Sequence, residues 1–421
     1  RCCGAANEAI YLSDRDRTKD EDKMMQEGKM RIKTVIRLKK RSSAYALFFA
    51  AQLSRSSAGL KTIGTVDDLM VMLQIACFLY CFLNRIKRKR FSMLDLSVIS
   101  FYLCLFISTV MVSRDFFSWL TYSLQGAGAI FLIEDMMAND EKESILVIRN
   151  VSFFFLLCNL ASVIMAPAGF FGDLYFLGAR IGFTPFCIMA VVSALLGDYI
   201  VNGKKISITS GAVILAAVVN VAAVRVSTGI LGLALLACMT AAGLLLCRIR
   251  KQNMVYILSC AIPGIAWLGI VLKGRTDIFQ TILSIVGEDL TFNGRTLIWE
   301  MALRYISEKP FWGYGVTVLG DFYITTYINK RSLPAHDELL NLLYQGGVAA
   351  FICWNILYFV VGHALKRCRE NYIIVLMSAA VFSFLCIMIT EIQSQKAIIF
   401  MVIALAYQLA VNHSMETEEH V

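Results

Sequence analysis

The sequence has few charged residues and few prolines, and both shortages restrict the fold. Charged residues make up 17% of the 421 positions, against about 25% in soluble domains. Only 5 prolines occur, and apolar runs of about 20 residues, the length that crosses a bilayer, recur along most of the chain. The alternating pattern of outer-membrane strands is absent. A soluble domain is thereby excluded, and a helical protein that crosses the membrane many times is predicted.

The sequence also lacks cysteines in its long polar segment and lacks grouped metal ligands. Most of the 13 cysteines lie inside apolar runs, where a thiol acts as a small hydrophobic group. Residues 273–335 contain none, which excludes a disulfide framework there. The acidic pair Asp67 and Asp68 has no evident third ligand, so helix capping explains it better than a cation site. We therefore expect no metal and no cofactor.

Basic residues cluster beside the apolar runs, which gives the formal net charge of +9 a membrane explanation. Such clusters mark the cytoplasmic ends of spans, and the strongest lies at residues 85–90. This distribution argues against nucleic acid as a partner. The chain does not begin with methionine, and Met30, which a basic cluster follows, is the start we expect for a membrane protein.

Apolar runs and basic clusters together predict an all-α, polytopic bundle of about 12 transmembrane helices with both termini cytoplasmic. A charged N-terminal segment without expected structure (1–43) precedes the first nine spans (44–272); a large extracytoplasmic loop (273–336), three further spans (337–411) and a cytoplasmic tail (412–421) follow. The expected spans are residues 44–59, 66–83, 94–112, 116–133, 145–166, 183–200, 206–224, 230–246, 255–272, 339–365, 373–390 and 397–411.

The large loop carries the polar features that indicate a site. Residues 296–307 have the spacing of a short amphipathic helix, which we expect at the bilayer surface. Gly294 and Arg295 stand at its start, where a cation and free backbone donors suit a phosphate group. The alternative is an ordinary surface helix with an unpaired arginine.

Two further features follow in the same loop. The aromatic turn, Pro310–Gly315, combines Trp312 and Tyr314 with glycines that permit close approach of a ligand, although anchoring among lipid headgroups explains the rings better. His336 titrates near neutrality and suits the orientation or deprotonation of a hydroxyl, unless its role is structural. The two carboxylates that follow it suit helix caps more than catalysis.

Arginines of other predicted outer loops fall on the same side of the membrane. Arg225 lies in a tight turn at residues 224–229 and is expected to face the same side as Arg295. Arg180 lies in the outer loop at residues 167–182. Ionisable residues at such depths are functional candidates, and snorkelling toward the headgroups is the alternative for Arg225.

Three motifs, in this order and spacing, resemble the O-antigen ligase and polymerase superfamily of bacterial inner-membrane glycosyltransferases. They are Gly-Arg at 294–295 followed by Trp299, Pro-Phe-Trp-Gly-Tyr-Gly at 310–315, and His336 ahead of a leucine-rich stretch with Gly-Gly at 346–347. The resemblance covers the membrane region from about residue 44 onward.

The chain departs from the family pattern at three places. Asp337 stands where the family usually has Asn, and Val224 replaces the Ser of a Ser-Arg turn. The loop that begins at Arg180 matches only loosely, which leaves the role of that residue open.

The resemblance implies a substrate carried on a polyprenyl pyrophosphate, in a site without metal. It also implies contact with membrane lipid and, as a further partner, a chain-length regulator protein. It makes His336 and Arg295 the catalytic candidates. The substrate-binding candidates are Arg225, Arg180, Trp299, Tyr314 and Asp337.

Two activities of the superfamily fit the sequence. Polymerisation of lipid-linked repeat units is favoured because no dedicated acceptor-binding domain is evident, and ligation of a finished glycan to another acceptor is the alternative. The alternative from another class is a transporter for lipid-linked sugars. Such a transporter predicts charges at the bilayer midplane and broken spans in repeated halves, and no internal repeat is visible.

Overall fold

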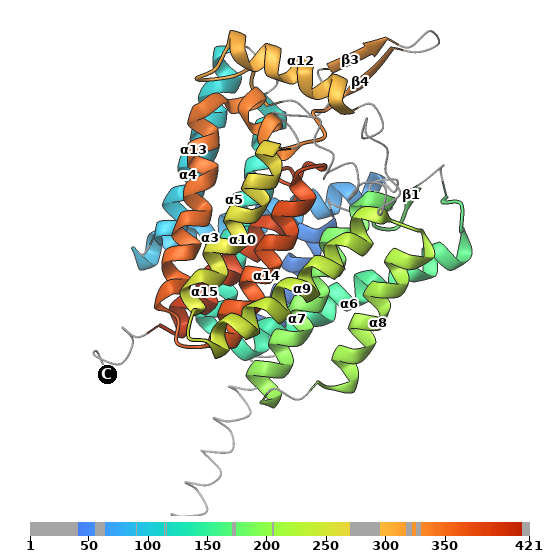
Figure 1. Cartoon of the computed structure of the whole chain (residues 1–421), viewed down its shortest axis with the longest axis vertical. Coiled ribbons are helices and arrows are strands. Elements are labelled where there is room, and N and C mark those ends of the chain that lie inside the picture. The colour runs from blue at the N-terminus through green and yellow to red at the C-terminus, as the bar shows by residue number, and fades with distance from the viewer. Residues whose placement is uncertain are drawn as a thin grey trace, which may run out of the picture. The chain divides into compact units, whose positions relative to one another are not determined.

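The computed structural model describes residues 41–54, 64–89, 91–112, 114, 116–170, 174–203, 206–269, 295–316, 322–325 and 330–414. The chain divides into two units, Arg1–Leu47 and Phe48–Val421. In the first unit the described residues, 41–47, are helical. The second unit is built almost entirely of helices (Figure 1).

The described elements of the second unit follow one another as helices joined mostly by short turns. The helices are α3 (Gly64–Arg88), α4 (Met93–Met111), α5 (Phe116–Asn139), α6 (Glu141–Met165), α7 (Phe183–Asn202), α8 (Ile208–Ala223), α9 (Ser227–Arg248), α10 (Gln252–Trp267), α12 (Arg295–Glu308), α13 (Glu338–Arg367), α14 (Asn371–Met388) and α15 (Ala397–Asn412), with a 3-10 turn, η1, at Arg180–Gly182. Two antiparallel hairpins pair β1 (Leu174–Tyr175) with β2 (Gly178–Ala179) and β3 (Phe322–Thr325) with β4 (Lys330–Leu333).

The prediction of an all-α polytopic membrane protein is confirmed. Among the described residues, 8 helices are long and apolar enough to cross a membrane: α3, α4, α5, α6, α7, α9, α13 and α14. The number of crossings stays a prediction, because α8, α10 and α15 have only 16 residues each. The expected spans at 44–59 and 255–272 also run beyond the described residues.

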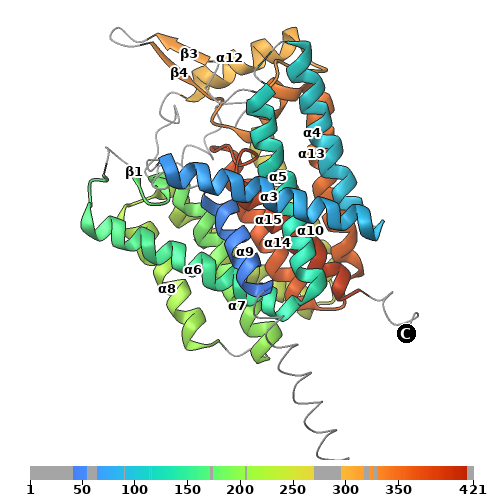
Figure 2. The same ribbon diagram turned by 180° about the vertical axis from the view of Figure 1, so that it is seen from behind.

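The last two helices form the centre of the packing. α14 packs against α9 and α10, while α15 packs against α5 and α13, and both helices are buried along most of their length. α13 lies along α4 in both views (Figures 1 and 2). The rings of Phe101, Trp354 and Phe400 meet where α4, α13 and α15 converge, with centroids 5.3 to 6.5 Å apart. Close aromatic packing of this kind adds to the stability of the core.

A buried charge cluster fixes the end of α3 to α4 and α5. The guanidinium of Arg85 donates to Asp95 at 2.6 Å and to Glu134 at 2.5 Å, and it lies over the ring of Phe131. Asp95 also forms a capping box with Ser92 at the start of α4. One arginine thus neutralises two carboxylates that are almost fully buried. The basic cluster predicted to mark the cytoplasmic side therefore also holds three helices together.

Replacement of Arg85 by alanine should lower the free energy of unfolding by about 3–5 kcal/mol, because two buried carboxylates lose their compensating charge. Thermal or denaturant unfolding of the purified protein in detergent measures the change. Lys87→Ala, at an exposed position two residues further along the same turn, is the matched control and should change stability by less than about 0.5 kcal/mol. Equal stability of the Arg85→Ala variant and the wild type would contradict this role.

Candidate active site

Helix α13 is broken one third of the way along its length. Gly347 has φ 62° and ψ −164°, which is outside any helical conformation. A break of this kind leaves backbone carbonyls and amides without their partners in the helix. Within a membrane protein such groups must find partners in the protein itself.

The aromatic turn supplies those partners. The amides of Tyr314 and Gly315 donate to the carbonyls of Tyr344 and Gln345, both at 2.8 Å. In the opposite direction, the amides of residues 348 and 349 donate to the carbonyls of residues 310 and 311, at 2.8 and 3.3 Å. The turn therefore replaces the missing helical hydrogen bonds on both sides of the break.

Helix α4 completes the joint from the other side. The hydroxyl of Ser108 donates to the carbonyl of Gln345 at 2.6 Å and accepts the amide of Gly315 at 2.9 Å. The hydroxyl of Thr109 accepts the amide of Val316 at 3.1 Å. Two adjacent hydroxyls of one helix thus bind both the broken helix and the turn.

Glycine is required on both sides of this joint. A Cβ atom at Gly313 would lie 2.4 Å from the carbonyl oxygen of Tyr344, and one at Gly347 would lie 2.3 Å from the carbonyl of Phe311. Both glycines also have positive φ, which other residues adopt only with strain. The glycine motifs at 313–315 and 346–347 are therefore two halves of one contact.

The aromatic side chains of the turn divide between two roles. Phe311 and Trp312 remain exposed, as expected of rings at a membrane–water boundary. Tyr314 stacks on Tyr344 with ring centroids 5.0 Å apart, and its hydroxyl donates to Glu308 at 3.0 Å. Tyr314 therefore holds the turn against both α12 and α13.

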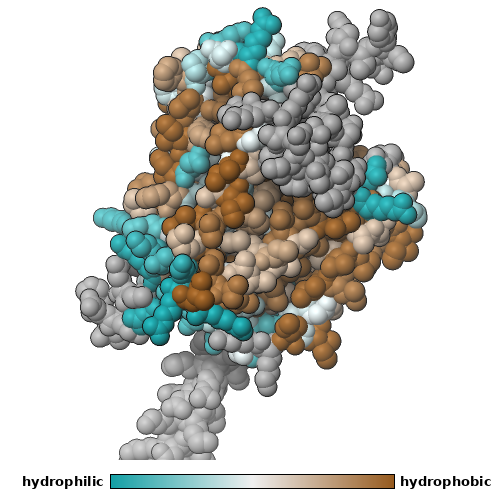
Figure 3. Space-filling view, viewed as in Figure 1, coloured by the Kyte–Doolittle hydropathy of each residue, from teal (hydrophilic) through white to brown (hydrophobic). Residues whose placement is uncertain are grey.

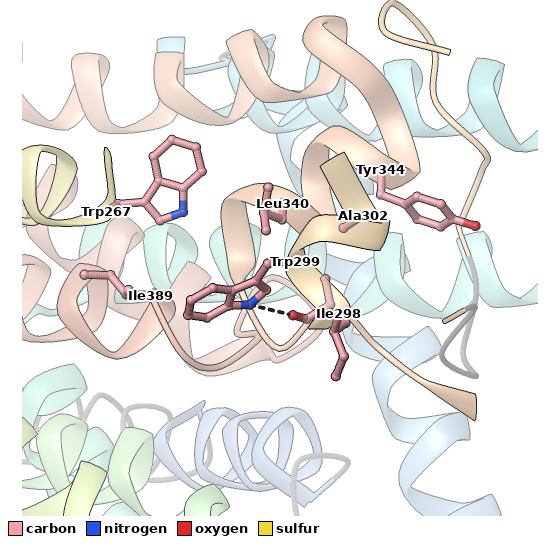
Figure 4. Close-up of a cluster of buried hydrophobic side chains, with 8 residues drawn as sticks. Trp267, Ile298, Trp299, Ala302, Leu340, Tyr344 and Ile389 are labelled. Atoms are coloured by element: carbon pink, nitrogen blue, oxygen red, sulfur yellow. Dashed lines mark hydrogen bonds between the residues drawn. The ribbon is translucent and has the colours of Figure 1, made fainter. Parts of the chain in front are cut away.

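Helix α12 covers the start of α13 with its apolar face turned inward (Figure 4). Four segments contribute buried residues to this contact: Trp267 from α10; Ile298, Trp299 and Ala302 from α12; Ala335, Leu340 and Tyr344 from the start of α13 and the residue before it; and Ile389 just after α14. The apolar face that the sequence places on the bilayer instead packs on the protein, because three helix ends converge here and leave an apolar recess.

His336 follows Ala335, which is buried in this recess, and precedes Asp337, the N-cap of α13. Its φ of 50° is left-handed, which costs a non-glycine residue about 1–2 kcal/mol. The indole of Trp299 donates to the carbonyl of Ala335 at 3.1 Å, which fixes the preceding residue (Figure 4). Strain that the surroundings enforce in this way gathers at functional sites.

Asp337 fixes the residue after His336. It is the N-cap of α13, as expected for a carboxylate here, and accepts the amide of Leu340 at 2.7 Å. Its second oxygen accepts the indole N–H of Trp267 at 2.8 Å. Burial raises the pKa of Asp337 to about 8, although both donors oppose that rise. His336 is thus tethered on its two sides by α12 and by α10.

The sequence predicts that Glu338 caps the start of α13, but its carboxylate binds a different segment. Its side chain does not cap α13; it accepts the backbone amides of Gln393 and Ser394, the latter at 2.8 Å, in the loop between α14 and α15. Glu338 is fully buried. The start of α13 is therefore joined to α12 at Ala335, to α10 at Asp337 and to the α14–α15 loop at Glu338.

Arg225 occupies the turn between α8 and α9, with an exposed side chain and φ 51°. Its amide donates to the carbonyl of Ala222, and the amide of Val226 donates to that of Val221, which is how helices end at a left-handed residue, usually glycine. Val226, the N-cap of α9, provides no side-chain acceptor. A cation thus stands beside the uncapped start of a 22-residue helix, an arrangement that attracts anions.

Two hydroxyl groups near this turn are not among the site residues predicted from the sequence. The Oγ1 atoms of Thr184 in α7 and Thr228 in α9 are buried and lack a hydrogen-bond partner among the described residues. The Oγ1 of Thr184 would lie 3.0 Å from a Cβ atom at Gly229, so glycine permits the close approach of α9 to α7. Arg180, in η1, precedes the first turn of α7. The only signal in the sequence is that Thr184 directly precedes Pro185 and that Thr228 directly precedes Gly229.

The site residues form two groups at one end of the second unit. One group surrounds His336, and the other contains Arg180 and Arg225. The last turn of α14 packs on the start of α9, and Ile389 lies in the cluster beneath α12, so α14 connects the groups. Arg295 is the first residue of α12, but its side chain lies outside the described residues and its place in the site stays a prediction.

A family match covers the segment that holds most of these residues. Residues 211–355 match the family model described as O-Antigen ligase. This match supports the resemblance of the chain to the O-antigen ligase/polymerase superfamily. The matched segment of this superfamily runs from α8 to the middle of α13 and includes Arg225, Arg295 and His336, whereas Arg180 lies outside it. No curated protein and no solved structure matches the chain.

Replacement of Gly347 by alanine should destabilise the protein by at least about 1–3 kcal/mol, because the left-handed backbone is strained and the added carbon collides with the aromatic turn. Unfolding in detergent measures the loss. Gly211→Ala in α8 is the matched control, since a Cβ atom there meets nothing within 4 Å. If both variants unfold at the same temperature, the joint does not hold α13 in place.

Proposed function

We propose that the protein transfers a glycan from a polyprenyl-pyrophosphate carrier to a sugar hydroxyl at the outer face of the bacterial cytoplasmic membrane, with both chain termini on the inner side. The superfamily of O-antigen ligase/polymerase-type transferases supplies the reaction class. The observation that carries the proposal is the left-handed His336, tethered on both sides at the end of the second unit that also holds the arginine turns.

In the proposed reaction the acceptor oxygen bonds to the anomeric carbon of the donor sugar, and the bond from that carbon to the pyrophosphate breaks. His336 orients the acceptor hydroxyl and takes its proton. The pyrophosphate leaves with the polyprenyl chain, and Arg225 and Arg295 neutralise its growing negative charge. These roles follow the chemistry of the residues and the superfamily pattern.

The surroundings of Arg225 support its assignment to the pyrophosphate. The uncapped amides at the start of α9 point toward the same turn. The buried hydroxyls of Thr184 and Thr228, which have no hydrogen-bond partner in the part of the chain that the structure describes, add two donors beside it. We assign Arg180, at the start of α7, to the same anion, as an additional contact from the neighbouring turn.

Trp299, Tyr314 and Asp337 take supporting roles in this proposal. Trp299 and Asp337 are buried, and both hold the backbone beside His336. Tyr314 packs the aromatic turn on Tyr344. We propose that they influence the substrate through the position of His336 and of the turn.

Polymerisation of lipid-linked repeat units is the form of the reaction that we favour, and ligation of a finished glycan is the alternative within the superfamily. A transporter is disfavoured by the break in α13. Transporters leave broken helices open toward a ligand, whereas here the aromatic turn fills the break with backbone hydrogen bonds.

Replacement of Arg225 by glycine separates its charge from its backbone role. Glycine relieves roughly 1 kcal/mol of left-handed strain, so the variant should fold at least as well as the wild type, yet product formation should fall about a hundredfold or more. Surface glycan made by cells that carry the variant, normalised to the amount of membrane protein, measures this fall.

Arg250→Gly is the matched control for that variant. Arg250 also follows a helix end with positive φ, shows the same pair of backbone hydrogen bonds and is exposed, but it lies at the opposite end of α9. Its replacement should leave product formation near the wild-type level. Full activity of Arg225→Gly, or equal losses in the two variants, would contradict the assignment to pyrophosphate.

His336→Asn tests the proton acceptor. Asparagine tolerates the left-handed conformation and retains hydrogen bonding, but it takes up no proton near neutral pH. Product should fall by about 10² to 10⁴, the usual contribution of a general base, while the melting temperature in detergent stays unchanged. An active His336→Asn variant would assign the histidine a structural role only.

A further inference from the structure

A groove runs along the seam between α10 and α13, on the side of these helices away from α4. Its volume is about 760 Å³, within the range of about 300–1,000 Å³ typical of small-molecule sites. Both walls are helix surface: Ile257 and Ala261 come from α10, and Phe359 and Gly362 from α13, which is long and apolar enough to cross the membrane. The groove does not include the residues assigned above to the transfer reaction.

The groove opens toward the lipid. Ile257 and Phe359 on its walls are 56% and 74% exposed, and Ile265 and Ile352 nearby on the same helices are 69% and 52% exposed. Apolar side chains so exposed on membrane-spanning helices face acyl chains. Hydrophobic residues cover this face in Figure 3, and hydrophilic residues gather at the lower left, where α10 begins and α13 ends. The occupant of the groove therefore enters from the bilayer.

The two ends of the groove differ in chemistry. At the end where α10 begins, the lining residues are Gln252, Asn253, His363 and Lys366. No carboxylate lines the groove among the residues that the structure describes. Three side chains able to donate hydrogen bonds and one ammonium group form a site for an anionic group. The basic clusters place this end at the cytoplasmic leaflet.

The floor of the groove is shaped by a specific contact. The hydroxyl of Tyr256 donates to the carbonyl of Tyr358 at 2.8 Å. Its ring crosses α13 at Gly362, where a Cβ atom would lie 2.5 Å from the ring. Glycine at this position therefore lets the tyrosine lie flat in the seam and keeps the groove wide above it.

We propose that this groove binds one anionic phospholipid of the cytoplasmic leaflet. The phosphate is held by Lys366, with His363, Gln252 and Asn253 as additional donors, and an acyl chain lies along Tyr256, Ile257 and Phe359. This inference is independent of the proposed glycan transfer. An isoprenyl chain whose pyrophosphate is held at the outer face fits the groove less well, because the apolar end of that chain would meet the polar residues at the cytoplasmic end of the groove.

The bound lipid has a route of influence on the active site. A smaller cavity of about 100 Å³ continues the seam and shares Cys260, Asn355 and Tyr358 with the groove. It reaches Trp267 and Ile389, which pack in the cluster beneath α12. A lipid that fills the seam thus supports the residue that donates to Asp337.

The test is a lipid titration of the full-length protein in neutral detergent, read as the melting temperature. Phosphatidylglycerol should raise that temperature more than zwitterionic phosphatidylethanolamine. Lys366→Gln should weaken the apparent affinity for phosphatidylglycerol about fivefold, which corresponds to about 1 kcal/mol for one basic residue at an anionic surface. Lys87→Gln, in the last turn of α3 and outside the groove, should bind like the wild type.

Ala261→Phe provides a second variant, because it narrows the apolar part of the groove and leaves Lys366 intact. It should lose the phosphatidylglycerol effect while its melting temperature without lipid stays within a few degrees of the wild type. Equal responses to both lipids, or equal affinities of the Lys366→Gln and Lys87→Gln variants, would overturn the proposal. A melting temperature that rises with polyprenyl phosphate but not with phosphatidylglycerol would also overturn the proposal, since that result assigns the groove to the polyprenyl carrier.

Discussion

The arrangement of the active-site end depends on one constraint: a helix that breaks inside a membrane protein must have its backbone groups satisfied by the protein. At Gly347 the break in α13 exposes carbonyls and amides on both sides. The aromatic turn and the hydroxyls of Ser108 and Thr109 meet them. The cost of an unsatisfied backbone group in an apolar setting is several kcal/mol, so these segments cannot separate without loss of the fold.

This joint determines where the candidate catalytic residue, His336, is placed. The break lets the first part of α13 take a separate course beneath α12, where Trp267, Trp299 and Leu340 bury one another. His336 stands at the start of that part, with its neighbours held by two indole N–H groups. A rigid scaffold can orient a histidine, and an exposed cation on a tight turn can neutralise charge. Group transfer requires both, because orientation and charge neutralisation supply most of the catalysis.

The sequence predicts much of this fold, for physical reasons. Apolar runs locate the helices because the bilayer imposes their length, and the pattern at 296–307 identifies α12. The two glycine motifs also stand out, but their contact does not, since nothing in either motif encodes pairing between segments so far apart. The partners of Glu338 and the burial of the Thr184 hydroxyl likewise depend on tertiary packing. The inward face of α12 is ambiguous in sequence, because bilayer and protein offer it the same apolar environment.

The central claim is that this end of the protein transfers lipid-linked glycans. The most direct measurement is the chain length and amount of lipid-linked glycan extracted from a strain that lacks the protein. We predict accumulation of lipid-linked donor, as single repeat units if the protein is a polymerase and as long chains if it is a ligase. A lipid-linked pool unchanged in amount and in length would contradict the account.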